Sequence, residues 1–309
     1  ERKNYKQKVE VEFSNVKFEN AKKRQFAEFL GEGTPRNRPF LKEAIERNLN
    51  FIDEMNEVYG WFINSLNVIS PKSRVRGLEF NLKENKNLSE SFSNFLNYFK
   101  TGITELSRKK VNVDTDISDI PVQLINEIIN DLKPGKRTII GSENNRRNYA
   151  IERKESGEIE VFKLAARHVS EKGKDVYFEL DEESDGTNRL IDLIPALIDL
   201  TTSETVYVID ELDRSMHPIL TRKIIEFFLS NSKNIASQLI VTTHESNLLD
   251  LDLLQRDEIW FVEKNKKNSS ELYSLLEFKP RKETNITKGY LQGRYGAIPF
   301  LSNPEDLNW

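Results

Sequence analysis

The sequence predicts a mixed α/β fold built on a parallel sheet, with a helical insertion in its first half. Residues 205–209 and 238–242 are short, continuous apolar runs, as is typical of strands buried in a parallel sheet. Helical patterns flank these runs at residues 190–200 and 218–229, the alternation expected of an α/β protein. Residues 40–66 space their apolar side chains by three and four, which predicts one long amphipathic helix.

The rest of the chain divides into helical and strand-rich parts. Residues 9–18 alternate apolar and polar side chains, which indicates one or two strands. We expect further helices at residues 88–106 and 120–132. Residues 138–180 hold several short runs of β-branched and aromatic residues, with a hairpin turn at residues 155–158.

Composition limits the class of protein. The chain has 309 residues, 37% hydrophobic and 31% charged, with a formal net charge of -4, which suits a folded chain larger than one typical domain. Cysteine is absent, so a disulfide framework and a thiolate metal site are excluded. No apolar run approaches the roughly 20 residues needed to cross a bilayer. We therefore expect a cytoplasmic protein without membrane contact.

Two adjacent carboxylates end the first apolar run. Asp210 and Glu211 follow residues 205–209 directly, and ligands of parallel sheets bind at the carboxyl ends of strands. Adjacent residues of a strand point to opposite sides. Asp210 can therefore face Mg²⁺ through its water shell while Glu211 faces an attacking water. This is a Walker B pattern; the alternative is a solvated acidic turn.

A histidine follows the second apolar run. Neighbouring parallel strands end at the same edge of a sheet, so His244 is expected beside Asp210 and Glu211. Its imidazole can donate a hydrogen bond to a phosphate oxygen. A purely structural histidine at a strand end is the alternative.

A polar turn precedes the helix predicted at residues 190–200. Ser184, Asp185, Gly186 and Thr187 offer a hydroxyl, free backbone N–H groups and the positive end of the helix dipole, which together favour an anion. An ordinary helix cap, in which these residue types are common, is the alternative.

The order of these motifs resembles the head of an ABC-type ATPase, which has a P-loop NTPase-like sheet. In that resemblance, Ser184 to Thr187 are a degenerate signature motif, Asp210 and Glu211 the Walker B pair, residues 214–217 the D-loop, and His244 the switch histidine. Residues 31–37, 241–249 and 288–300 also resemble the AAA-type branch, which includes the RloA-, PtuA-, AriA- and AbiL-like ATPases of prokaryotic anti-phage defence.

The resemblance implies ATP and Mg²⁺ as cofactors. It assigns catalysis to Glu211 and His244 and the metal, through water, to Asp210. It further implies that the remaining site residues contact ATP held by the opposite subunit or connect the subunits; these are Ser184, Asp185, Gly186, Thr187, Ser215 and His217. The expected assembly is a homodimer that sandwiches nucleotide between its heads, or a higher oligomer of such pairs.

The resemblance also suggests a division of the chain and a biological role. Residues 1–39 are expected to be the remainder of an amino-terminal ATPase lobe, residues 40–135 a helical insertion, and residues 136–309 the carboxyl-terminal ATPase lobe. The implied role is sensor or regulator of an anti-phage complex that controls a nuclease or toxin effector, with nucleic-acid contact left open. One alternative is an SMC- or RecF-like DNA-repair or chromosome-maintenance ATPase. Another is a scaffold without hydrolysis, against which Glu211 argues.

One essential motif is missing. The 309 residues contain no G-x-x-x-x-G-K-[ST] phosphate-binding loop. Residues 31–34 are glycine-rich but lack the lysine, and we expect a turn there. Hydrolysis therefore needs a Walker A segment from outside these residues, and we expect them to be part of a longer polypeptide. For residues 289–300, a partner-binding loop and a tight packing element both stay open, and His168 is expected on a strand or at the surface.

Overall fold

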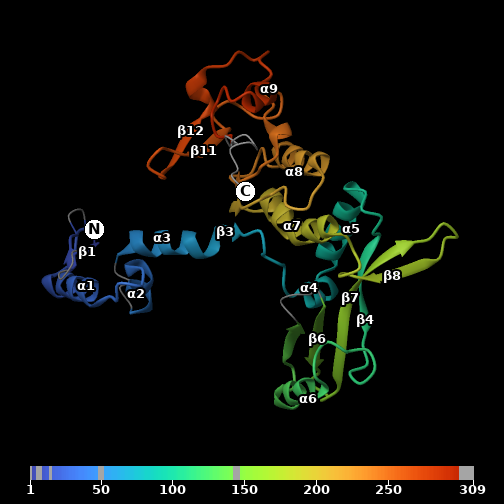
Figure 1. The fold of residues 1–309 in the computed structure, drawn as a ribbon. Coiled ribbons are helices and arrows are strands. Elements are labelled where there is room, and N and C mark those ends of the chain that lie inside the picture. The colour runs from blue at the N-terminus through green and yellow to red at the C-terminus, as the bar shows by residue number, and fades with distance from the viewer. Residues whose placement is uncertain (1, 5–8, 14–15, 48–51, 142–146, 299–309) are drawn as a thin grey trace, which may run out of the picture.

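The computed structural model describes residues 2–4, 9–13, 16–47, 52–141 and 147–298, and it confirms the mixed α/β prediction (Figure 1). A parallel three-stranded sheet has the order β10-β9-β3. Its strands are β3 (Leu66–Ile69), β9 (Val206–Ile209) and β10 (Gln238–Val241). All three lie in the same register, so their carboxyl ends meet at one edge.

The structure describes the following other elements in chain order. The helices are α1 (Ala21–Gly33), α2 (Phe40–Glu46), α3 (Asp53–Asn64), α4 (Leu78–Glu84), α5 (Lys86–Tyr98), α6 (Val122–Asp131), α7 (Asp185–Thr202), α8 (Pro218–Asn231) and α9 (Ile286–Leu291), with 3-10 turns η1 (Ser246–Leu248) and η2 (Leu275–Phe278). The remaining strands are β1 (Arg2–Asn4), β2 (Val9–Val11), β4 (Glu105–Lys110), β5 (Arg137–Gly141), β6 (Asn148–Arg153), β7 (Ile159–Val169), β8 (Asp175–Glu179), β11 (Trp260–Lys264) and β12 (Ser270–Ser274).

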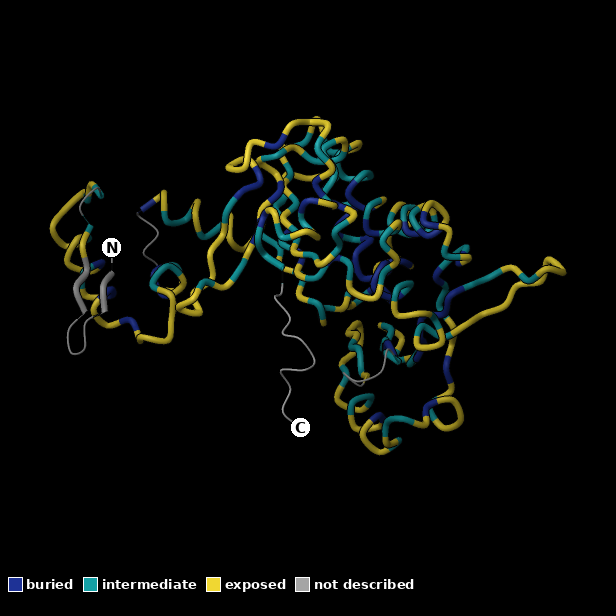
Figure 2. The backbone as a smooth tube through the Cα atoms, turned by 45° about the horizontal axis from the view of Figure 1, so that its top comes forward, coloured by how far each residue is buried: buried dark blue, intermediate teal, exposed yellow. Residues whose placement is uncertain are grey.

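Helix α7 joins the two main cores. Its residues Leu193 and Leu197 pack with α8 and the parallel sheet, whereas Ile191 and Ile194 pack with α5 and the antiparallel sheet. Apolar residues therefore cover a wide arc of one helix, and different parts of that arc pack in different cores, as expected of a helix buried between two layers. Figure 2 shows the exposed outer segments around these buried layers. Any relative movement of the two sheets must act on α7.

The antiparallel sheet has the long strand β7 at its centre. β7 pairs with β4 along one side, and along the other with β6 at its start and β8 at its end. Residues 155–158 form the predicted hairpin turn between β6 and β7, where Gly157 takes a positive φ of 86°. Helix α6 covers one face, with Ile125 buried against Tyr149 and Ile151. The β7–β8 hairpin projects from the rest of the molecule (Figure 1).

Two helix predictions were wrong. The single helix predicted at residues 40–66 is two helices, α2 and α3, and residues 48–51 lie outside the described part. The range also ends in β3, which pairs with β9 in the parallel sheet. The helix predicted at residues 88–106 ends at Tyr98, and β4 follows. Local spacing could not separate these short strands from the helices before them, because their pairing partners lie far along the chain.

The glycine-rich stretch at residues 31–34 is helical, so the turn predicted there was also wrong. Gly33 is the last residue of α1, and Thr34 caps the helix by donating its hydroxyl to Leu30 O at 2.7 Å. Ala27 and Leu30 bury against α2 and the start of α3. The stretch therefore serves to end and pack a helix.

The tyrosine- and glycine-rich segment near the carboxyl end packs tightly in its described part. Tyr290 and Tyr295 both stack on Phe261 of β11, with ring centroids 5.6 and 6.0 Å apart. A Cβ on Gly296 would lie 2.5 Å from the Tyr273 hydroxyl, so only glycine fits. Of the two alternatives, the packing element is the one observed; residues 299–300 lie outside the described part.

One face of the parallel sheet stays open among the described residues. Val68, Val208 and Ile240 form a row across β3, β9 and β10 on the side away from α7 and α8. Val68 is 66% exposed and Ile240 is 54% exposed. Within the described ranges β10 also pairs on one side only. Unpaired edges and exposed apolar rows are features that proteins normally cover.

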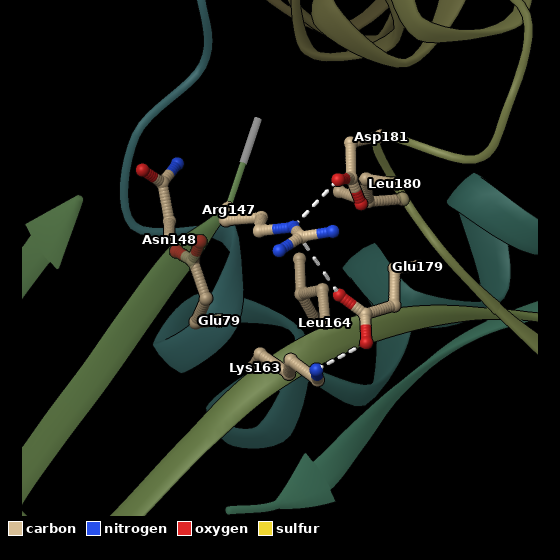
Figure 3. Close-up of a pocket in the computed structure, with 8 residues that line it drawn as sticks. All are labelled: Glu79, Arg147, Asn148, Lys163, Leu164, Glu179, Leu180 and Asp181. Carbon is tan, nitrogen blue, oxygen red and sulfur yellow. Dashed lines mark hydrogen bonds and ion pairs between the residues drawn. The ribbon is translucent and has the colours of Figure 1, made fainter. Parts of the chain in front are cut away.

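Helix α4 buries a carboxyl group beside the antiparallel sheet. Glu79 is 4% exposed, and its Oε2 has no hydrogen-bond partner among the described residues. Figure 3 shows Glu79 beside Asn148 at a cavity of about 10 Å³, room for about one water. Burial raises the pKa of Glu79 above its ordinary value of 4.5.

No helix of the described residues is both long and apolar enough to span a membrane.

We predict that Glu79→Gln stabilises the protein at neutral pH. The raised pKa means that the folded chain loses stability as pH rises from 4.5 through the folded value, because the charged form is the one that burial disfavours. Glutamine carries no such charge. Urea unfolding between pH 4 and pH 8 should give equal stability at the acid end and a more stable variant at pH 8. A variant less stable at pH 8 would contradict the assignment.

Candidate functional site

The two strand ends that carry the predicted polar residues meet at one edge. Leu212 N donates to Thr242 O at 3.0 Å, which continues the β9–β10 pairing past the strands. The Thr242 hydroxyl donates to Asp210 Oδ1 at 2.5 Å and accepts from Glu211 N at 2.9 Å. One hydroxyl therefore fixes the first carboxylate and the backbone of the second. Sequence analysis did not assign Thr242 to the site.

The backbone at the acidic pair is strained. Glu211 has a φ of 48°, in the left-handed region that residues with a side chain seldom adopt. Such a conformation costs about 1 to 3 kcal/mol and tends to occur where a side chain must be aimed. The bond from Glu211 N to Thr242 Oγ1 helps to hold it. Glu211 leaves the strand half-exposed, with Arg214 Nη1 at 3.9 Å from its carboxylate.

His244 shares this edge with the acidic pair. Its backbone N–H donates to Asp213 Oδ1 at 3.3 Å, which connects the loop after β10 to the loop after β9. Asp210 and His244 are both exposed. The arrangement leaves an open, oxygen-rich edge with an imidazole nearby.

The 184–187 turn opens α7 as predicted. Ser184 is the N-cap; its Oγ accepts from Thr187 N at 3.0 Å and lies 2.8 Å from Thr187 Oγ1. A Cβ on Gly186 would lie 2.7 Å from Ser215 O, so the turn rests against the loop after β9. Ser184 and Asp185 are exposed.

The predicted D-loop residues lie in the same group. Ser215 takes a φ of 59°, a second left-handed residue within five positions of Glu211. His217 caps α8, and its Nδ1 accepts from Ile219 N at 3.2 Å. All the predicted site residues thus belong to one continuous region, made of the two strand ends, the loop between β9 and α8, and the start of α7.

A buried arginine that sequence analysis missed joins these parts. Arg189 of α7 is 4% exposed, and its guanidinium donates to three backbone carbonyls. The acceptors are Ser70 O after β3 at 3.3 Å, Asp210 O at 3.2 Å and Glu211 O at 3.4 Å. The only sequence signal is its place five residues after Ser184, which does not reveal that it is buried.

The side chains at this edge suit a hydrated Mg²⁺ ion. The exposed Asp210 carboxylate offers the hard oxygen that Mg²⁺ prefers while keeping several waters. Among the described residues no group of three or more His, Cys, Asp or Glu side chains could hold a metal ion by itself. The 309 residues contain no glycine-rich loop with lysine to cradle phosphates. The region therefore offers a carboxylate to a hydrated Mg²⁺ ion but not the loop that would cradle the phosphates of a nucleotide.

Comparison with protein-family models identifies the family of the chain. A family model described as "AAA domain, putative AbiEii toxin, Type IV TA system" matches residues 16–250, more than half of the sequence. The chain belongs to this AAA domain family. The matched region includes the parallel sheet, the 184–187 turn, the acidic pair and His244. No curated protein matches the sequence.

Family membership supports the coarser part of the sequence predictions. An AAA domain is in general an ATPase domain, which agrees with the mixed α/β fold and its parallel sheet. The description of the family names a toxin and a type IV toxin–antitoxin system, a context related to defence. The finer assignments of branch, residue roles, dimer and effector belong to the proposal below.

We predict that Thr242→Val destabilises the protein by about 1 kcal/mol, because it removes the hydroxyl shared by Asp210 and Glu211 N. Thr242→Ser keeps the hydroxyl and should restore most of the loss. Chemical denaturation of the two variants and the wild type measures the difference. Equal stability of all three would show that the hydroxyl does not hold the strand ends together.

We predict that Gly186→Ala disturbs the contact between α7 and the loop after β9. The added methyl would meet the backbone at Ser215 O, which cannot move as a side-chain end can, and the cost of such overpacking is about 1 to 3 kcal/mol. The control is Gly60→Ala in α3, where the nearest atom is 3.8 Å away and alanine favours the helix by about 0.5 to 1 kcal/mol. Thermal unfolding should separate the two variants in opposite directions.

Proposed function

We propose that the chain is the hydrolysis-bearing part of an ABC-type ATPase head of the RloA/PtuA/AriA/AbiL-like branch, a regulator of an effector in prokaryotic anti-phage defence. The observation that carries the proposal is the meeting of Asp210, Glu211 and His244 at one edge of the parallel sheet. Membership of the AAA domain family supports it.

Each side chain has a role that its position suits. Mg²⁺ would neutralise charge on the phosphates of ATP, and Asp210 would hold the ion through its water shell. Glu211 would orient the attacking water and accept its proton. His244 would donate to the terminal phosphate. Thr242 supports this assignment because its hydroxyl keeps the Asp210 carboxylate and the Glu211 backbone in fixed relation.

Dimerisation completes the site in this proposal. The 184–187 turn would meet the terminal phosphate bound by the opposite subunit, with the Ser184 hydroxyl and the Gly186 N–H at the start of α7. Its contact with Ser215 supports a shared surface of the turn and the D-loop. A two-fold axis would use each surface twice, so ATP would close the pair and hydrolysis would open it.

The phosphate-binding loop must come from residues outside this sequence. We propose that its strand adds in parallel to the free edge of β10, because that edge is unpaired among the described residues and β10 is the strand that leads directly into Thr242 and His244. A parallel strand there would bring its following loop to the edge that holds Thr242 and His244.

The partner is proposed to be a protein, a nuclease or toxin effector, acting in the cytoplasm. Basic residues cluster in the sequence at residues 22–24, 136–137 and 146–147. Several of these cations are paired with carboxylates, as Lys23 is with Glu19 at 2.5 Å and Arg147 with Asp181 at 2.6 Å. Such pairing lowers the local positive potential that a DNA-gripping ATPase needs. This charge pattern favours the sensor over the chromosome-maintenance alternative.

We predict that Glu211→Gln, in the assembled ATPase that includes the phosphate-binding segment, retains ATP and accumulates the closed dimer. Loss of the proton acceptor should lower turnover by about a hundredfold or more. The contacts to ATP that do not depend on the charge of Glu211 should stay in place. Phosphate release and size-exclusion chromatography with ATP and Mg²⁺ provide the two measurements.

The matched control is Glu204→Gln, an exposed carboxylate before the amino end of β9. It makes the same chemical change beside the opposite end of the same strand, and it should leave turnover unchanged. Undiminished phosphate release by Glu211→Gln would remove Glu211 from its assigned role.

A further inference from the structure

A histidine outside the proposed site is bonded to the residue that precedes the 184–187 turn. His168 Nε2, on β7, donates to Glu183 Oε1 at 2.6 Å. Both side chains are largely buried, 23% and 11% exposed respectively. Charge-assisted bonds in such partly buried positions are stronger than exposed ones. Neither residue has a role in the chemistry proposed above.

The imidazole is held on its other sides as well. The Phe178 ring meets it edge-on, with centroids 5.1 Å apart. Gly102 gives it room, since a Cβ there would approach His168 Nδ1 to 3.4 Å. These contacts come from β8 and from the turn between α5 and β4, so the antiparallel sheet and its surroundings fix the direction of the Nε2–H bond.

Further hydrogen bonds in the segment between β8 and α7 connect the bonded Glu183 to the 184–187 turn. Asn188, 1% exposed in the first part of α7, donates its side-chain N–H groups to Leu180 O at 2.7 Å and Glu183 O at 3.2 Å. Glu182 accepts from Glu179 N at 2.7 Å through its carboxylate. Hydrogen bonds therefore hold the segment to both the sheet and the helix, so its backbone has little freedom to move between them.

Two ion pairs fasten the earlier part of the same segment (Figure 3). Arg147 of the loop before β6 binds Asp181 at 2.6 Å, and Lys163 of β7 binds Glu179. These pairs hold the end of β8 on the sheet. The bond between His168 and Glu183 is the last of the series and lies next to Ser184, so it has the most direct hold on the turn.

We propose that His168 is a positioning residue: through Glu183 it fixes the 184–187 turn, so that the antiparallel sheet sets how this turn meets nucleotide on the opposite subunit. The trans contact rests on the proposed function. The anchoring itself rests only on the contacts of this chain. A partner that binds the antiparallel sheet thereby gains a route to the ATPase site of the neighbouring subunit.

The first test measures amide hydrogen exchange in the protein without nucleotide. Loss of the anchor in His168→Leu should speed exchange at Thr187 and Asn188 about tenfold, the effect of one lost hydrogen bond. His168→Gln keeps a donor near the same place and should restore slow exchange. Glu183→Ala removes the same bond from the other side and should speed exchange as much as His168→Leu does. Either variant is therefore sufficient for the test if the other fails to fold.

The matched control is Arg167→Gln. Arg167 lies next to His168 on β7 but on the opposite face, where it pairs with Glu105 at 3.1 Å and Asp175 at 3.4 Å. Its loss removes ion pairs of the same strand without touching Glu183. Faster exchange at Thr187 and Asn188 in this control, or unchanged exchange in His168→Leu and Glu183→Ala, would overturn the anchoring.

The second test uses mixed dimers in which one head carries Glu211→Gln. The remaining active site uses the 184–187 turn of that variant head, so His168→Leu placed there should lower turnover about tenfold. The same change placed in the other head should leave turnover at the level of the mixed dimer. Equal effects from both placements would overturn the inference. A Glu211→Gln mixed dimer with full turnover would instead overturn the proposed function, with the exchange result unaffected.

Discussion

The site depends on one buried cation. The Arg189 guanidinium donates to carbonyls at the ends of β3 and β9, and the same residue belongs to the first turns of α7. It therefore joins the helix that begins with Ser184 to the strand end that carries Asp210 and Glu211. A buried arginine is costly unless its donors are bonded, and both terminal nitrogens of Arg189 find carbonyl acceptors at the strand ends.

Helix α7 also links the strand ends to both sheets. Different parts of its apolar arc pack in different cores, one shared with the parallel sheet and one with the antiparallel sheet. Packed interiors resist gradual deformation, so a displacement on one side is passed to the other instead of being absorbed. The antiparallel sheet is thereby joined to the strand ends through Arg189, and to the 184–187 turn through His168 and Glu183.

Sequence patterns were sufficient where local chemistry changes abruptly. The β9 and β10 runs are apolar and end in polar residues, and the 184–187 turn holds the residue types that cap helices, so both were placed correctly. β3 was missed because its four residues continue the apolar spacing of α3, and only pairing with β9, far along the chain, makes them a strand. Thr242 and Arg189 were missed because hydroxyls and arginines are usually solvated, and their burial or bonding depends on tertiary contacts.

The central claim is that the two strand ends and the 184–187 turn of a second subunit converge on one terminal phosphate. The most direct measurement is a structure of the assembled ATPase with Mg²⁺ and a non-hydrolysable ATP analogue. The account predicts the terminal phosphate between Glu211 and His244 of one subunit, with Ser184 of the other subunit within hydrogen-bond distance. Nucleotide bound away from Glu211, or a 184–187 turn facing solvent in the nucleotide-bound assembly, would contradict it.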